Sequence, residues 1–290
     1  MRSLKARVPW WARIPAKIVL SRLPVPFAAW RRLALFQHGA MNSGAYVWFV
    51  FGRHLQEFMG PNGLAGLTLL ELGPGDGIAT GLLASALGAE RTYLVDVGGF
   101  ASRSVADYQG MLAGWRARGL KTEHLERCTS FEELCAAGRT TYLTGGLASL
   151  RAIPGASVDV QLSNAVLEHV RLAQFDSTLA ELRRVLKPGG FARHAVDLKD
   201  HLGGRLEHLR FPERRWESPL FARSGFYTNR IRFEEMQARF RAAGFDASVS
   251  SVLRWPALPT PRARLPGPFR ALADEELCIS AFDVALRAAG

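Results

Sequence analysis

Four residues at alternate positions, an acid followed by three glycines, form the stretch whose spacing points most directly to chemistry. Apolar residues lead into it and a helix-compatible run follows it, which predicts a buried strand, a tight turn and the start of a helix. Glycine lets the backbone turn sharply and lets a ligand approach without a Cβ in the way. The residues are Glu71, Gly73, Gly75 and Gly77. Their pattern predicts a nucleotide-binding loop.

Two classes of nucleotide ligand compete for this loop. A dinucleotide fingerprint requires Gly-x-Gly-x-x-Gly, and Ile78 stands where its last glycine would be. Glu71 at the strand end would repel a pyrophosphate and attract a cationic group. The residues therefore favour a ligand that presents positive charge to the loop.

Three further stretches follow in order. Residues 92–96 indicate a second strand that ends in Asp96, an acceptor for hydroxyl hydrogen bonds. Residues 158–169 indicate another strand with its exit loop. Residues 186–190, Leu-Lys-Pro-Gly-Gly, indicate the turn into the strand after it. Each stretch alone is also typical of an ordinary turn or cap, and only their order and spacing together favour a cofactor fold.

Together the four stretches resemble the class I S-adenosylmethionine-dependent methyltransferases over residues 60–290. The resemblance implies a Rossmann-like, doubly wound α/β fold whose seven-stranded sheet ends in an antiparallel hairpin. It implies S-adenosyl-L-methionine as cofactor, S-adenosyl-L-homocysteine as product, and ribose binding by Asp96. The cofactor-binding residues implied by it are Glu71, Gly73, Gly75, Gly77, Asp96, Val97, Gly145, Leu147, Asn164 and Ala165. Many relatives carry an acid near the adenine where this chain has Gly146 and Leu147. We therefore expect adenine recognition through backbone groups and apolar contact.

The chain divides by charge. Its net charge is +11, yet residues 1–56 hold nine basic residues and no acid, so the remainder is nearly neutral. We expect residues 1–60 to form an N-terminal helical arm or lid and residues 61–290 the methyltransferase domain. Basic residues mixed with tryptophans also suit peripheral contact with an anionic membrane surface. The lid is the preferred interpretation, and no apolar run is long enough to span a membrane.

Two segments exceed the minimal fold. Residues 199–230 form an insertion directly after the fifth expected strand, and residues 256–268 form a proline-rich loop inside the closing hairpin. Ligands of open α/β sheets bind outside the carboxyl ends of the strands. Both segments leave from near that rim, so both are candidates for the acceptor pocket.

Methyl transfer from a sulfonium needs alignment and exclusion of water, and a hydroxyl acceptor also needs a base. We expect His201 to be this base, oriented by Asp197 or Asp200, with His169 on the preceding exit loop as the alternative. His194 lies within the fifth expected strand and is interpreted as a packed side chain. An alternative is that Asp197 and His201 merely hold the insertion in place.

The acceptor is narrowed by exclusion. The exit loop of the fourth strand reads Ser-Asn-Ala-Val at 163–166 and lacks the Asn/Asp-Pro-Pro-aromatic motif of enzymes that methylate base nitrogens. Cys128, Cys135 and Cys278 are not placed as nucleophiles, and no Cys or His spacing indicates a metal site. They are expected to be apolar fillers in a reducing cytoplasm. We expect O-methylation of a small-molecule or glycan hydroxyl in a biosynthetic pathway, with nucleic acid an unfavoured partner.

Two rival functions stay open. One is an RNA or protein methyltransferase that uses the basic arm as a phosphate or partner contact. The other is a non-catalytic protein of the same fold that docks on a membrane or partner. The intact loop and Asp96 argue against the second.

Overall fold

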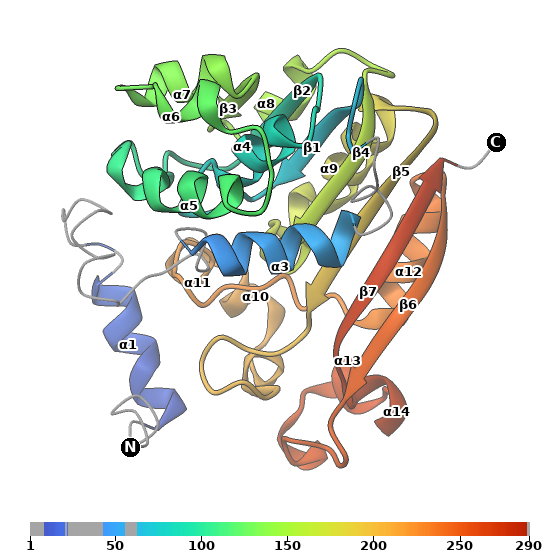
Figure 1. The fold of residues 1–290 in the computed structure, drawn as a ribbon. Coiled ribbons are helices and arrows are strands. Elements are labelled where there is room, and N and C mark those ends of the chain that lie inside the picture. The colour runs from blue at the N-terminus through green and yellow to red at the C-terminus, as the bar shows by residue number, and fades with distance from the viewer. Residues whose placement is uncertain (1–8, 21, 23–42, 56–62, 289–290) are drawn as a thin grey trace.

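One seven-stranded mixed sheet organises the molecule, for which a computed structural model describes residues 9–20, 22, 43–55 and 63–288. The strand order is β3-β2-β1-β4-β5-β7-β6, with β1 to β5 parallel and β7 antiparallel to both of its neighbours (Figure 1). The strands are β1 (Thr68–Leu72), β2 (Arg91–Val95), β3 (Thr140–Leu143), β4 (Val158–Asn164), β5 (Leu186–Asp197), β6 (Phe245–Arg254) and β7 (Ile279–Ala288). The predicted doubly wound fold with a closing hairpin is confirmed.

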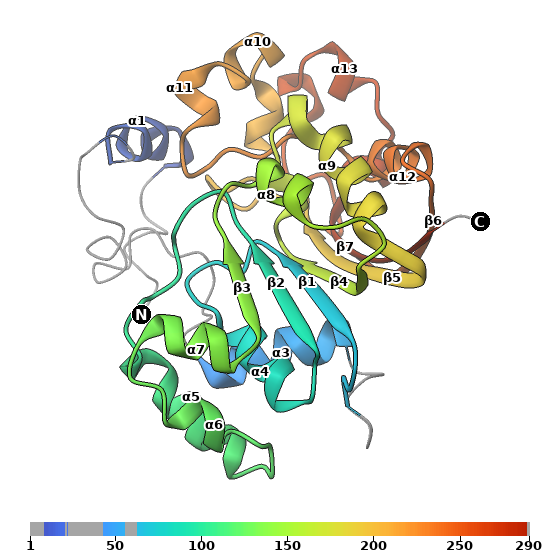
Figure 2. The same cartoon turned by 90° about the horizontal axis from the view of Figure 1, so that it is seen from above.

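Helices cover both faces of the sheet (Figure 2). On one face lie α3 (Gly44–Leu55), α4 (Ala79–Ala86) and α5 (Ala106–Arg116), followed by the short α6 (Glu123–Glu126) and α7 (Phe131–Ala137). On the other lie α8 (Leu147–Ala152), α9 (Leu172–Val185) and α12 (Phe233–Ala242). Alternate residues of β1 face opposite ways, so Leu69 joins the first core and Leu70 the second.

The Lys-Pro-Gly-Gly stretch differs in detail from its prediction as a turn. β5 already starts at Leu186, which pairs with Val158, and the register shifts before Val160 meets Phe191. Gly189 takes a φ of +78°, which a residue with a side chain rarely adopts. The stretch is therefore a bulged first part of β5, in which glycine adopts the irregular backbone conformation without strain.

The segments beyond the minimal fold gather at one end. The insertion holds the 3₁₀ turn η4 (Glu207–Arg210), α10 (Glu213–Trp216) and α11 (Pro219–Ala222). The loop between β6 and β7 holds η5 (Arg262–Arg264), α13 (Gly267–Arg270) and α14 (Asp274–Leu277). The N-terminal α1 (Trp10–Leu20) lies beside α11 and α10 in both ribbon views. These elements build two small cores of their own next to the carboxyl ends of the strands.

The helix α3 connects the arm to the main core. Phe51 and Leu55 are fully buried among side chains of α4 and α5. The division at residue 60 remains a prediction, and residues 56–62 lie outside the described part of the chain. The described residues hold no helix long and apolar enough to cross a membrane.

Candidate functional site

The glycine loop lies where the strand order reverses, between β1 and β4. Gly73 and Gly75 have φ angles of +71° and +68°. A Cβ on Gly73 would lie 2.5 Å from Cγ2 of Val166 on the β4 exit loop, so side-chain-free backbone is required there. The loop is held to β2 by a hydrogen bond from Gly73 N to Val95 O at 2.8 Å. The predicted loop geometry is therefore present, and Gly77 follows in its buried last turn.

A hydrogen bond joins the Asp96 side chain to the glycine loop. The Oδ2 atom of Asp96 accepts from Gly75 N at 3.3 Å, and its Oδ1 atom accepts from Val97 N at 2.7 Å. Burial raises the pKa of Asp96 to about 6, opposed by these backbone donors. An ionised carboxylate has about four acceptor positions, so two backbone bonds leave room for hydroxyl donors. The geometry fits the ribose-binding role expected of this residue.

Glu71 is a buried acid beneath the loop. It is only 2% exposed, and its Oε2 has no hydrogen-bond partner. Burial raises the pKa of Glu71 from 4.5 to about 8. A carboxyl group in this state gains most from a cation, because a cationic partner restores the ionised form in a low-dielectric site. The unpaired oxygen fits the ammonium group of a bound amino-acid moiety.

The expected adenine subsite is apolar and exposed. Val97 is 80% exposed, although it is a large apolar residue. Gly146, with φ +54°, lies against it, since a Cβ there would be 3.1 Å from Val97 Cγ1. Leu147 is half-buried, and Gly145 N donates to Ser149 Oγ at 2.9 Å. These features agree with recognition by backbone and apolar contact, which remains a prediction.

The β4 exit is supported from α3. Asn164 Nδ2 donates to Tyr46 OH at 3.3 Å, and Ala165 takes a φ of +56° while its N–H donates to Ala195 O. Tyr46 was not indicated by the sequence, because its contact depends on where α3 packs. The exposed Ala165 therefore presents unusual backbone at the rim beside the glycine loop.

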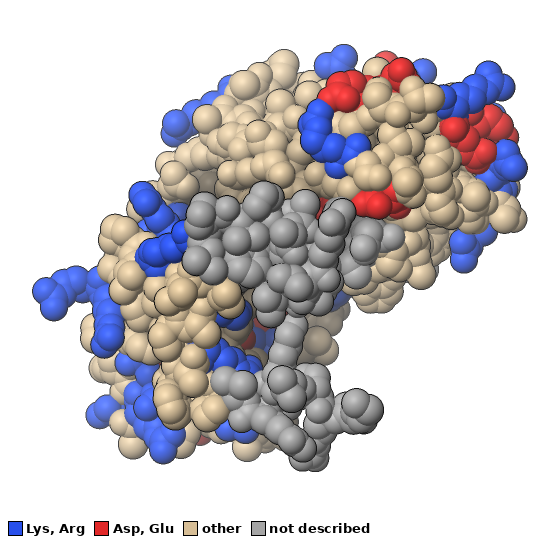
Figure 3. Space-filling model, turned by 90° about the vertical axis from the view of Figure 1, so that its left-hand side faces the viewer, with Lys and Arg blue, Asp and Glu red and all other residues tan. Residues whose placement is uncertain are grey.

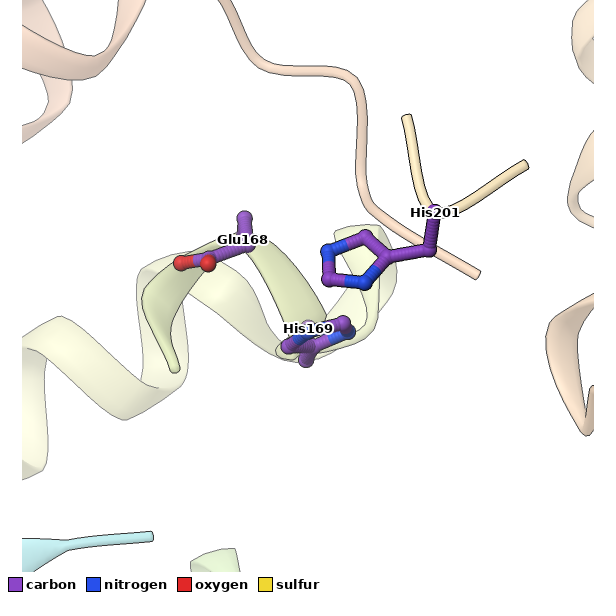
Figure 4. A group of neighbouring side chains, drawn as sticks. All are labelled: Glu168, His169 and His201. Carbon is purple, nitrogen blue, oxygen red and sulfur yellow. The ribbon is translucent and has the colours of Figure 1, made fainter. Parts of the chain in front are cut away.

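Two histidine rings meet at the exits of β4 and β5. His169 ends the 3₁₀ turn η3 (Leu167–His169), and His201 follows β5; their ring centroids are 4.7 Å apart (Figure 4). His169 Nδ1 lies 2.8 Å from Tyr227 O, and because a carbonyl only accepts, Nδ1 carries the proton. Burial, then the neighbouring His169 and Lys17, lowers the pKa of His201 to about 3. The structure thus brings together both histidines proposed as the base.

Comparison with known proteins identifies a family for the part of the chain that carries this site. Residues 70–193, from the middle of β1 into β5, match a family described as "Methyltransferase domain". These residues form a methyltransferase domain, and the strand order is that of the class I fold. Its cofactor is S-adenosylmethionine, which agrees with the glycine loop, Glu71 and Asp96. No curated protein matches the methyltransferase in sequence at a significant level.

Solved structures similar to the methyltransferase act on several chemical classes. A Burkholderia thailandensis 1,6-didemethyltoxoflavin-N1-methyltransferase with bound S-adenosylhomocysteine has 15% identity and a TM-score of 0.45, covering 97% of this chain and 89% of that one. A Haemonchus contortus phosphoethanolamine N-methyltransferase has 16% identity and a TM-score of 0.48, covering 93% and 59%. A Mesorhizobium loti S-adenosylmethionine-dependent methyltransferase has 18% identity and a TM-score of 0.42, covering 79% and 94%. Likeness at this level does not identify a substrate.

The two aspartates expected to orient His201 have other partners in the methyltransferase. Asp200 Oδ1 accepts from Leu202 N and Gly204 N, and its Oδ2 accepts from Arg205 N and Glu207 N. Burial would raise the pKa of Asp200, but His208 and these backbone donors hold it below its usual value. The carboxylate is thus the organising group of the 200–207 turn. Its role in orienting His201 stays a prediction, since the hydrogen bonds of the carboxylate go to the turn.

Asp197 is directed toward its own loop. Its Oδ1 accepts from Lys199 N at 2.9 Å, and its Oδ2 lies 3.2 Å from Lys199 Nζ. This arrangement fits the alternative interpretation, in which Asp197 holds the start of the insertion. His194 is 1% exposed and its Nδ1 lies 2.8 Å from Ser163 Oγ, so its interpretation as a packed side chain is confirmed.

The acid next to the two histidines is Glu168. It belongs to the 158–169 stretch, and no function was proposed for it from the sequence. It is 2% exposed, and neither carboxylate oxygen has a hydrogen-bond partner. Burial raises the pKa of Glu168 well above its usual value, opposed in part by Lys199 and by the backbone N–H groups of Glu168 and Asp197, which lie near the carboxylate without reaching hydrogen-bonding geometry. The signal available in the sequence was an acid directly before a histidine after an apolar strand. Its burial could not be read from that pattern.

The insertion forms a wall rather than a stacking platform. Trp216, Phe226 and Tyr227 are almost fully buried against one another, with Trp216 Nε1 donating to Thr228 O at 2.7 Å. One of its arginines is engaged in the same core: Arg230 donates to Phe211 O and lies over the Trp216 ring. These aromatic and basic residues therefore shape the rim and hold α1, instead of lying open for a sugar to stack on.

Proposed function

We propose that the protein transfers a methyl group from S-adenosylmethionine to a hydroxyl of a small molecule or glycan. The observation that carries this proposal is the pair of histidine rings at the exits of β4 and β5, 4.7 Å apart and at the same carboxyl edge of the sheet as the glycine loop. Histidine is the side chain most often used to take a proton near neutral pH, and a hydroxyl needs that help where an amine does not.

His169 has the better geometry for the base. Donation from its Nδ1 to Tyr227 O selects the tautomer whose Nε2 accepts a proton. His201 has its pKa lowered to about 3, so it holds a proton only weakly, which suits contact with the acceptor more than proton removal. This reverses the preference for His201 that the sequence indicated.

The arm supports the acceptor side in this proposal. Lys17 Nζ donates to His201 O at 3.0 Å, and Arg13 Nη1 donates to Leu202 O at 2.5 Å. The ring of Trp10 packs edge-on against Phe211 at 6.3 Å. The helix α1 therefore braces the start of the insertion and acts as a fixed wall, as expected of a lid.

A membrane contact through the arm is retained as a second role. Trp11 and Val19 lie on the outer face of α1 and are 62% and 59% exposed. Lys and Arg side chains gather over the lower part of the face in Figure 3, at the height of α1 in Figure 1. Indole and basic groups of this kind suit an anionic headgroup layer. A cytoplasmic location with peripheral binding would follow, tested by liposome co-sedimentation of Trp11→Ser.

A donor-consumption screen tests the proposed function. Purified protein is given S-adenosyl-L-methionine with panels of hydroxylated metabolites and glycans, matched amines, and RNA. We expect turnover with a hydroxyl acceptor that is insensitive to salt. Turnover only on amines would contradict the acceptor class, and an RNA affinity that falls steeply with salt would favour the nucleic-acid alternative.

A further inference from the structure

Three side chains of metal-ligand type meet at the acceptor rim. Glu168 and His169 come from η3, and His201 comes from the loop after β5. Each offers one ligand atom, and these atoms all lie within 4.8 Å of one another. In Figure 4 the ring of His201 points toward the turn that carries the other two residues. The cluster therefore joins residues from two separate exit loops in one small space.

The cluster contains buried polar atoms with no partner. Both carboxylate oxygens of Glu168 and the Nε2 atom of His201 are inaccessible to water and have no hydrogen-bond partner. Such atoms are rare in folded proteins because each one forgoes the hydrogen bonds it had in water. An acceptor carboxylate and an acceptor imidazole nitrogen side by side can be satisfied together by one cation.

The third residue is already oriented as metal-binding histidines usually are. His169 gives its Nδ1 proton to a backbone carbonyl, that of Tyr227, at 2.8 Å. A carbonyl partner of this kind fixes the tautomer and the ring orientation of a histidine ligand. The closeness of His169 also favours the neutral form of His201, since two imidazolium rings at this distance would repel, and neutral imidazole is the form that binds metal.

We propose that Glu168, His169 and His201 bind one divalent transition-metal ion of the zinc class. Two imidazoles and one carboxylate favour zinc over magnesium or calcium, which prefer oxygen ligands. Three protein ligands leave a fourth position open, as in catalytic zinc sites. Metal–nitrogen bonds of about 2.0–2.1 Å put tetrahedral ligand atoms about 3.3 Å apart, so the ligand atoms must close by about 1.5 Å.

Charges around the site act in both directions. Lys17 and Lys199 reduce affinity for a cation, but Lys199 is paired with Asp197 at 3.2 Å and Lys17 is bound to His201 O. The buried Glu168 supplies the compensating negative charge. No sequence pattern predicted a metal site here, because the two histidines lie far apart in the chain and only the fold brings them together.

The ion and the base role proposed for His169 would use the same atom, Nε2, so His169 acts as base only in metal-free protein. If a hydroxyl occupied the open position, the ion would lower its pKa, and this consequence alone rests on the proposed function. The metal is therefore tested without donor or acceptor. Binding of S-adenosyl-L-homocysteine to the same metal-stripped protein is measured separately, so that one result can fail without the other.

The experiment is a titration of chelator-stripped, tag-free protein with zinc chloride by calorimetry. We expect one ion per chain, and a dissociation constant raised at least about tenfold to a hundredfold in His169→Ala, His201→Ala and Glu168→Gln. His124→Ala is the matched control, since that exposed histidine lies on α6, outside the cluster, with its Nε2 3.2 Å from Ser85 Oγ. Cobalt in place of zinc should give a visible absorption band that is lost in the His201 variant.

Three results would overturn the proposal: no stoichiometric zinc binding, binding unchanged in all three variants, or equal weakening in His124→Ala. Glu168 is buried, so Glu168→Gln is first checked for a cooperative thermal transition. If it does not fold, the two histidine variants decide, because His169 is exposed and His201 half-buried. A fourth result would also overturn it: in zinc-free protein, Glu168→Gln shifts the pKa of His201 while zinc affinity stays the same. That outcome would indicate a hydrogen bond between the carboxyl group and the imidazole in place of a metal site.

Discussion

The donor rim and the acceptor rim of this sheet are built in different ways. The donor rim, residues 71–97, is nearly continuous in sequence: a strand, a glycine loop, a helix and the next strand. The acceptor rim combines Lys17 from α1, His169 from η3, and His201 and Tyr227 from the insertion, which are three separate segments. Local sequence can specify the first, whereas the second exists only once the insertion and α1 have packed.

The two rims also differ in their electrostatics. At the donor rim, burial raises the pKa of Glu71 to about 8 and that of Asp96 to about 6. A cationic or hydroxyl-bearing ligand would therefore stabilise the ionised form of both acids. At the acceptor rim burial lowers the pKa of His201 to about 3, which keeps the ring neutral. The donor rim is thus suited to binding charge, and the acceptor rim to receiving or sharing a proton.

The largest effect is expected from the histidines. His169→Ala should lower the turnover number by about 10²–10⁴-fold, because a general base contributes on this scale, while S-adenosyl-L-homocysteine affinity stays within about twofold. His201→Ala should mainly raise the acceptor Michaelis constant. Steady-state kinetics separates these outcomes. Full turnover in His169→Ala with loss in His201→Ala would restore His201 as the base.

The glycine loop should respond in the opposite sense. Gly75→Val introduces a side chain at φ +68° in the ligand's path and should weaken S-adenosyl-L-homocysteine binding at least tenfold, about 1.4 kcal/mol. Gly66→Val is the control, because Gly66 has a similar φ of +75° with nothing within 4 Å of its Cβ position. Equal affinity losses in both variants would mean that backbone strain, not ligand contact, is responsible.

The arm tests whether the acceptor rim depends on α1. Trp10→Ala removes the contacts with Phe211 and with Arg210, whose guanidinium lies 4.9 Å from the ring centroid. We expect a roughly threefold to tenfold higher acceptor Michaelis constant, about 0.7–1.4 kcal/mol, with cofactor binding kept. Trp11→Ala, on the exposed face of the same helix, should leave both unchanged. Deleting residues 1–30 should act as Trp10→Ala does, and an unfolded deletion variant would contradict the lid.

The smallest effect concerns pH. Glu71 keeps its proton in the folded state up to about pH 8 but loses it near 4.5 when unfolded, so its contribution to stability declines as pH rises through this window. Relative to Glu71→Gln, the wild type should lose at least about 1 kcal/mol of unfolding free energy between about pH 5 and pH 8. Bound S-adenosyl-L-homocysteine should remove the difference. The exposed Glu90→Gln is the control. If the unfolding free energies of wild type and Glu71→Gln change in parallel with pH, Glu71 is not held protonated in the folded state.

Short-range patterns in the sequence were enough to predict the donor rim and most elements. The stretch 92–96 contains most of β2, the stretch 158–169 contains β4, and the expected closing hairpin is β6 and β7. The roles of Asp200 and Glu168 could not be predicted. Asp200 looked like a partner for the adjacent His201, yet turn formation directs backbone N–H groups to it first. No local pattern indicated that Glu168 is buried, because its burial depends on the packing of β5 and the insertion over η3.

The aromatic residues of the insertion teach the same lesson. Aromatic residues in a candidate acceptor segment could have formed a stacking surface, but Trp216 is fully buried and donates to Thr228 O. Composition cannot separate an aromatic binding surface from an aromatic core, because the hydrophobic effect favours burial wherever enough apolar neighbours meet. That outcome depends on contacts between α1, α10 and α11, which no local pattern encodes.

The division between the two rims is tested most directly by one calorimetric comparison of S-adenosyl-L-homocysteine affinity in Asp96→Ala and His169→Ala. Asp96→Ala should weaken binding about tenfold to a hundredfold or more, because hydrogen bonds to a charged group contribute about 1.5–3 kcal/mol. His169→Ala should leave the dissociation constant within about twofold of the wild type. Unchanged affinity in Asp96→Ala together with a large loss in His169→Ala would contradict the account, since the donor would then lie at the rim assigned to the acceptor.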